Sequence, residues 1–106
     1  MAEQFRVADY QGRPVLLADD GMAHIRQRHP DMMNRLDAIA DAIHAPAAVT
    51  RSRLLDRGEN HYGRYGDRLY VRVSVIYRPT PDGWVGEVMT AHLIDRIEAK
   101  EEHLWP

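Results

Sequence analysis

The run RLYVRVSVIYR, residues 68–78, constrains the fold of this chain more than any other segment. Its apolar and polar side chains alternate, and this is the two-residue period of a β-strand. Valine and isoleucine also favour strands, because their branched side chains fit a pleated surface. One face of the predicted strand holds Leu69, Val71, Val73 and Val75, and the other holds Tyr70, Arg72, Ser74 and Ile76. The run therefore predicts a central strand with a buried face and an opposite face that presents Arg72.

Two helices are predicted before this strand. The segment DMMNRLDAIADAIHA, residues 31–45, repeats apolar side chains at helical spacing and ends at Pro46. A shorter helix is expected from Asp19 or Asp20 to His29, because Pro30 disfavours helical geometry in the residue before it. The ring of His29 is expected to close the C-terminus of this helix, where a cation is favoured.

Other segments are predicted to complete a sheet. FRVADYQGRPVLLAD is typical of a short hairpin, and AVTRSRLLD, NHYGRYG and WVGEVMTAHLI are predicted strands. The apolar residues of the last strand do not share one parity, so a bulge or bend is expected near Gly86. Residues 95–106 should form a short helix or an ordered tail. The expected fold is α+β, with an N-terminal short hairpin and two helices packed on a mostly antiparallel sheet of about four strands.

Length and composition limit the classes of protein that fit. The 106 residues suffice for a single domain, residues 1–106, with one modest core. No apolar run approaches the roughly 18 residues of a membrane span, so no membrane partner is expected. The N-terminus lacks the basic and then apolar layout of a secretory signal, and a cytoplasmic location is the expectation. Because the chain has no cysteine, disulfides, thiolate nucleophiles and cysteine-ligated metals are excluded.

Charge is distributed unevenly, although the formal net charge is only −2. Residues 51–78 carry seven arginines against three carboxylates. This segment could form a cationic face that binds RNA phosphates through Arg51 and Arg64, with Arg28 of the first helix as a further contact. Tyr62 or Tyr65 could stack on a base. The alternative is that these arginines are only the solvated face of the strands.

Metal-dependent and serine-dependent chemistry find little support. His24 and His29 are five residues apart, so they would diverge by about 140° around a helix instead of converging on one ion. The H-E-x-x-H pattern is absent, and neither serine lies in a G-x-S-x-G turn. No metal and no cofactor are therefore expected.

RNA cleavage without a metal remains open to this chain, because RNA supplies its own nucleophile, the 2′-hydroxyl. Such cleavage needs a general base, a general acid and cations around the phosphate. Histidine suits both proton transfers, and arginine presents a planar fork to phosphate oxygens. The chain contains these residue types: His24 on the first helix, Arg64 and Arg72 on the central strands, and Thr90 and His92 on the last strand. Of these, His24, Arg72, Thr90 and His92 are the expected catalytic residues.

Four stretches in order resemble a known group of nucleases. They are HIRQRHP, AIADAIHAPAAV, LYVRVSVIY and VMTAHLIDRIEAKEEHLWP. The chain resembles the small standalone members of the phage-associated barnase–EndoU–colicin–RelE-like (BECR) nuclease superfamily. The resemblance implies helices packed against a four-stranded antiparallel sheet, with the cleft on the sheet. It also implies metal-independent ribonuclease activity, often that of a toxin or prophage effector, with RNA and an antitoxin or immunity protein as partners.

Individual residues match this pattern in different degrees. His24 matches the histidine of the helix, Arg72 the basic strand position and Thr90 the hydroxyl of the last strand. His92 departs from the pattern, because it stands where an aromatic residue is expected, and it either adds a proton-transfer group or marks a divergent site. Two alternatives stay open: His24 is only the polar end of a helix, or the fold serves a non-enzymatic RNA- or protein-binding module.

Overall fold

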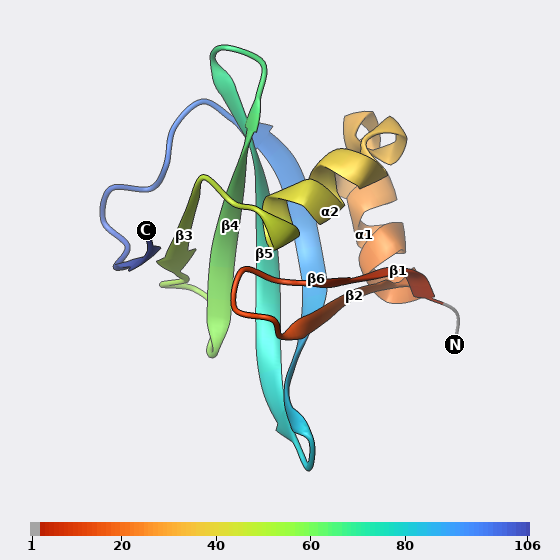
Figure 1. Cartoon of the computed structure of the whole chain (residues 1–106). Helices are drawn as coiled ribbons and strands as arrows, with labels where there is room; N and C mark the ends of the chain where they lie inside the picture. The colour runs from red at the N-terminus through yellow and green to blue at the C-terminus, as the bar shows by residue number, and fades with distance from the viewer. Residues whose placement is uncertain (1–2) are drawn as a thin grey trace.

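A single mixed sheet of seven strands, covered on one face by helices, organises the computed structural model, which describes residues 3–106 (Figure 1). Its spatial order is β1-β2-β6-β5-β4-β3-β7. The strands are β1 (Glu3–Ala8), β2 (Pro14–Ala18), β3 (Ala48–Arg51), β4 (Gly58–Tyr65), β5 (Leu69–Thr80), β6 (Gly83–Ile94) and β7 (His103–Trp105). The helices are α1 (Asp19–Arg28), a 3-10 helix η1 (Pro30–Asn34) and α2 (Leu36–His44).

The α+β class is confirmed, but the sheet has more strands than the four predicted. The N-terminal hairpin joins the same sheet, because β2 pairs in parallel with β6 at Gly86 and Glu87. At the other edge, β7 pairs with β3, so the predicted C-terminal tail ends as a strand. Both additions pair backbone groups that would otherwise be left open at the edges of a smaller sheet. The remaining neighbours in the sheet are antiparallel.

Two predicted elements are shorter in the structure. The helix expected over residues 31–45 is divided at Arg35, whose backbone leaves helical geometry (φ −128°, ψ 31°) and whose guanidinium donates to the Tyr65 hydroxyl at 2.7 Å. The strand expected from AVTRSRLLD stops at Arg51. In both cases contacts with distant parts of the chain override the local pattern. No helix within residues 3–106 is long and apolar enough to cross a membrane.

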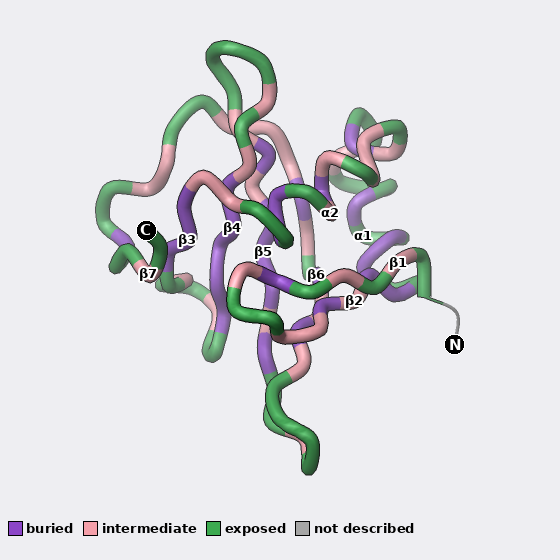
Figure 2. Tube along the Cα trace, viewed as in Figure 1, coloured by how far each residue is buried: buried purple, intermediate pink, exposed green. Residues whose placement is uncertain are grey.

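The core lies between the helices and the sheet, and Figure 2 shows buried residues along the middle of β3, β4 and β5. Val71, Val73 and Val75 are buried as predicted. Leu69, expected on the same face, is 37% exposed at the start of β5. The helices contribute Met22, Ile25, Met32, Ile39 and Ile43 to this core.

A bulge in β6 determines which of its side chains face away from the helices. The register passes from Ser74 opposite Thr90 to Val75 opposite Val88, so Met89 is the extra residue. The prediction had placed the irregularity near Gly86. Because successive strand residues alternate between faces, this extra residue leaves Val88 in the core and turns Thr90 to the opposite face.

Helix α1 packs against β6. The two elements are close at Val88, directly after Gly86 and Glu87, the two residues of β6 that pair with β2. Gly21 makes this close approach possible, because a Cβ atom there would stand 2.5 Å from the Val88 carbonyl oxygen. Met22 and Ile25 point into the core, whereas His24 is exposed. The helix therefore presents His24 beside the part of β6 that contains Thr90.

Candidate functional site

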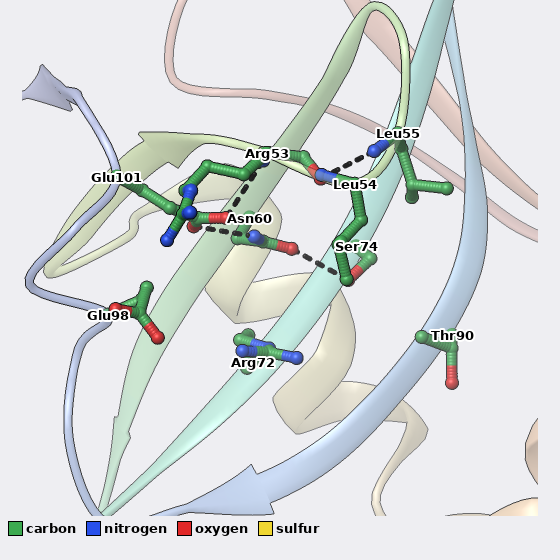
Figure 3. Close-up of a pocket in the computed structure, with 10 residues that line it drawn as sticks. Arg53, Leu54, Leu55, Asn60, Arg72, Ser74, Thr90, Glu98 and Glu101 are labelled. Carbon is green, nitrogen blue, oxygen red and sulfur yellow. Dashed lines mark hydrogen bonds between the residues drawn. The ribbon is translucent and has the colours of Figure 1, made fainter.

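The face of the sheet opposite the helices carries a polar patch across its central strands. Two rows of cross-strand neighbours form it: Asn60, Ser74 and Thr90 in one row, and Tyr62, Arg72 and His92 in the other. The loop of residues 52–57 and the segment of residues 95–102 border this patch and enclose a cavity of about 440 Å³. In Figure 3, Arg72 lies between Glu98 of the C-terminal segment and Thr90 of β6.

Glu101 ties the C-terminal segment to the patch. Its carboxylate accepts hydrogen bonds from Thr50 Oγ1 at 2.8 Å, Asn60 Nδ2 at 2.9 Å and the Arg53 backbone N–H at 3.0 Å. Ser74 Oγ donates to Asn60 Oδ1 at 2.7 Å and extends the chain of hydrogen bonds (Figure 3). Burial acts to raise the pKa of Glu101, but these hydrogen bonds outweigh it and keep the pKa below its ordinary value.

Three neighbouring side chains of the patch have buried polar atoms without a hydrogen-bond partner in residues 3–106. They are Arg72 Nε, Thr90 Oγ1 and His92 Nδ1, out of five such atoms in this part of the chain. Buried polar groups in proteins almost always have partners, and each exception requires an explanation. Arg72 and Thr90 also line the cavity of about 440 Å³, and a guanidinium beside a hydroxyl is suited to an anionic ligand with several oxygens, such as a phosphodiester.

His92 is held in its neutral form. Burial, followed by electrostatic interaction with Arg72 and His29, lowers the pKa of His92 to about 4, although Asp31 acts in the opposite direction. The rings of His29 and His92 stack with their centroids 5.0 Å apart and their planes 21° apart. At neutral pH the His92 ring is therefore uncharged and has a lone pair open to a proton donor, but it is a weaker base than an ordinary histidine. His29, which we expected only to close α1, is a neighbour of the site that sequence reasoning missed.

His24 lies beside the same patch. It lines a second cavity, of about 470 Å³, together with Leu55, Met89 and Thr90. Leu55 and Thr90 also line the first cavity, so the two hollows adjoin. Arg72, Thr90 and His92 thus lie on adjacent strands on the face opposite the helices, and His24 of α1 reaches this region through the adjoining cavity that it shares with Thr90.

The tyrosines predicted to stack on bases do not offer free rings. Tyr62 is fully buried, because the C-terminal segment covers it and the Glu98 backbone N–H donates to its hydroxyl at 3.3 Å. The prediction that Tyr62 binds a base is therefore wrong for this arrangement. Tyr65 is engaged by Arg35, which lies 5.0 Å from its ring centroid. The neighbouring Tyr70, 6.2 Å from the Tyr62 ring, is only half-buried.

The predicted RNA-binding arginines are spread around the molecule. Arg64 is exposed on the patch side of β4, and its guanidinium lies 5.7 Å from the Tyr70 ring centroid. Arg28 is exposed at the end of α1, next to His29. Arg51 instead lies on the helix side of the sheet, because it pairs in register with Glu59. Of these three arginines, Arg64 alone is placed on the patch face by strand register, and Arg28 precedes His29, whose ring stacks on His92.

Within residues 3–106, no three histidine or acidic side chains are arranged to hold a metal ion. A scan against protein-family models finds no match for the chain, and searches of curated proteins and of solved structures find none either. The resemblance to the BECR nucleases therefore rests on the residues and motifs of the sequence.

Proposed function

We propose that this protein is a metal-independent endoribonuclease that cleaves RNA through attack of the 2′-hydroxyl. The observation that carries the proposal is the group of unpartnered buried polar atoms on Arg72, Thr90 and His92, with His24 in the adjoining cavity. This group contains each chemical function that the reaction needs: a neutral imidazole, a second imidazole, a guanidinium and a hydroxyl.

Each side chain has a role in the proposed reaction. His92 accepts the proton of the 2′-hydroxyl as the oxygen attacks phosphorus. The Arg72 guanidinium and the Thr90 hydroxyl stabilise the negative charge that grows on the non-bridging oxygens. His24 donates a proton to the leaving 5′-oxygen, and the P–O5′ bond breaks. The products are a 2′,3′-cyclic phosphate and a free 5′-hydroxyl.

RNA as a substrate is consistent with the cytoplasm as the site of action. A toxin or prophage effector of this kind would be restrained by an antitoxin or immunity protein, which is the class of protein partner that we infer. The proposed contacts to the phosphates on either side of the scissile bond are Arg64, on the patch face of β4, and Arg28, exposed at the end of α1.

Cleavage of end-labelled RNA by the purified chain tests the proposal. We expect cleavage in excess chelator, a 2′,3′-cyclic phosphate on the product, and no cleavage when the scissile ribose is replaced by deoxyribose. His24→Ala should lower the rate by about 10²- to 10⁴-fold, the usual contribution of a general acid or base. His103→Ala is the matched control, because His103 is an exposed histidine on the edge strand β7.

A binding module on the same fold is the competing function. A chain that binds RNA with an affinity that depends on Arg72, yet leaves all the labelled RNA intact, would overturn the nuclease and establish this module. Equal rates for His24→Ala and His103→Ala would remove His24 from the reaction.

A further inference from the structure

A separate cavity lies on the helix side of the sheet, next to the turn of the N-terminal hairpin. It measures about 280 Å³ and is lined mainly by Arg13, Arg51, Arg57, Glu59, Tyr77 and Trp84. Register places it on that side, because Arg51 is opposite Glu59 and Glu59 is opposite Val75 of the core. It shares no residue with the patch around Arg72, and the proposed function does not use it.

One wall of this cavity is fixed by a buried ionic network. The Arg13 guanidinium donates to Asp9 Oδ2 at 2.7 Å and to Glu59 Oε1 at 2.9 Å, and it lies 3.9 Å from the centroid of the Tyr77 ring. Tyr77 in turn donates to Asp9 at 2.6 Å. Because the Arg13 donors are occupied within the protein, this arginine forms a rigid wall and leaves ligand binding to its neighbours.

Arg57 supplies an available cation at the cavity. Its guanidinium has no ion pair or hydrogen bond with other side chains of residues 3–106, and the residue is exposed. Its backbone adopts the left-handed region (φ 57°), held there by a hydrogen bond from the Tyr77 N–H to its carbonyl at 3.0 Å. Glycine or asparagine occupies this region at lower cost, so an arginine here points to a use for its side chain.

Arg51 and Trp84 provide the other two elements of a recognition site. Among the side chains of residues 3–106, Arg51 pairs with Glu102 alone, in a surface pair whose side chains are 59% and 67% exposed. Such pairs yield readily to a competing anion. Trp84 is 45% exposed although its side chain is large and apolar. Exposed indole and guanidinium groups together are the side chains that stack on a base and bind its phosphate.

We propose that this cavity binds a nucleotide, with its phosphate on Arg57 and Arg51 and its base against Trp84. The nucleotide is either free or part of an RNA strand. An RNA strand is included as a source because the loop of residues 52–57 borders both sites. Leu54 and Leu55 of this loop line the cavity beside Arg72, and Arg57 lines the present cavity.

Fluorescence of Trp84 tests the site directly. In a Trp105→Phe variant Trp84 is the only tryptophan, since the chain contains two. We expect AMP or a hexaribonucleotide to quench its emission, adenosine to quench it more weakly, and inorganic phosphate to compete. Quenching by the hexamer alone identifies an RNA strand as the source, and quenching by AMP identifies a free nucleotide. Titration calorimetry on the unmodified chain repeats the measurement without the Trp105 substitution.

Arg57→Asn separates binding from a structural role of the loop. Asparagine tolerates the left-handed backbone, so the melting temperature should stay the same or rise, while affinity should fall by about tenfold, the loss expected for one charge-assisted contact. Arg68→Asn, in the loop at the other end of β4, should bind as the parent chain does. Arg72→Ala should leave the quenching of Trp84 by AMP unchanged and should lower RNA cleavage by about 10²- to 10³-fold, so that a failure of either site is recognised separately.

Three outcomes overturn the proposal. The first is unchanged Trp84 emission with both AMP and the hexamer at millimolar concentration. The second is equal affinity of the Arg57→Asn and Arg68→Asn variants, and the third is loss of the quenching in Arg72→Ala. Each of the last two would place the bound nucleotide elsewhere.

Discussion

Arg72 and His92 face each other across β5 and β6, and each affects what the other can do. The positive charge of Arg72 adds to burial in lowering the pKa of His92. Arg72→Gln should therefore raise the pKa of His92 above about 4, but not to the value of a free histidine, because burial remains. Asp31→Asn should shift this pKa in the opposite direction. Titration of the histidine ring protons by NMR measures both changes.

Arg68→Gln is the control for this titration, since Arg68 lies in the turn between β4 and β5 and is absent from the causes of the His92 shift. An unchanged midpoint for His92 in Arg72→Gln would show that the two side chains do not interact electrostatically.

The shape of the Arg72 side chain should matter as well as its charge. Arg72→Ala should lower RNA cleavage by about 10²- to 10³-fold, the range seen when one donor to a transition-state oxyanion is removed. Arg72→Lys should recover only part of this loss, because an ammonium is a point charge without the planar fork. Rates at saturating RNA are the measurement. Full recovery by lysine would reduce the role of Arg72 to that of a simple counter-charge.

Helix α1 is positioned on β6 by Gly21. Alanine usually stabilises an unhindered helical position relative to glycine, by about 0.4 to 1 kcal/mol. At Gly21 the new Cβ atom would meet a backbone oxygen, that of Val88, which cannot rotate away. Gly21→Ala should therefore reduce the free energy of unfolding by about 1 to 3 kcal/mol, as overpacking does. Urea denaturation gives the sign, with the exposed substitution Gln27→Ala as control.

The N-terminal hairpin is held to the sheet by Arg13, which bridges Asp9 and Glu59. Arg13→Gln would leave two nearly buried carboxylates without their cation, and removing one partner of a buried pair costs about 3 to 5 kcal/mol. Arg6→Gln in the same hairpin is the control and should change stability little, because its pair with Glu3 is solvated. If both variants unfold at the same urea concentration, the network does not anchor the hairpin.

Acid should destabilise the whole molecule through three carboxylates that join distant segments. For Asp9, Glu59 and Glu101, burial raises the pKa, but hydrogen bonds and nearby cations outweigh it, and each pKa lies below its ordinary value. The stabilisation from such groups is complete above the unfolded pKa of about 4 and is lost as pH falls through the lower folded pKa. The urea midpoint should therefore fall from pH 5 to pH 2.5, with a smaller fall in Glu59→Gln. A constant midpoint would contradict these shifts.

Local pattern was sufficient where one face of an element packs into the hydrophobic core and the other face carries polar side chains. Alternation along residues 68–78 predicted the buried valines of β5 and the outward position of Arg72, and helical spacing predicted that Ile39 and Ile43 lie in the core. The strand residues Arg72, Thr90 and His92 and the helical His24 could be chosen from chemistry, because cleavage of RNA needs few residue types.

Long-range pairing determined what these patterns could not show. The bulge at Met89 turns Thr90 outward, and the C-terminal segment buries Tyr62 and brings Glu101 to Asn60. Alternation assigns a residue to one of two faces, but it does not say which strand lies beside it or which segment covers it. Strand neighbours and covering segments depend on three things: which backbone groups at strand edges are hydrogen-bonded, which buried charges are paired, and which backbones pack closely. These contacts join segments that are far apart in the sequence, so they form only when the chain folds.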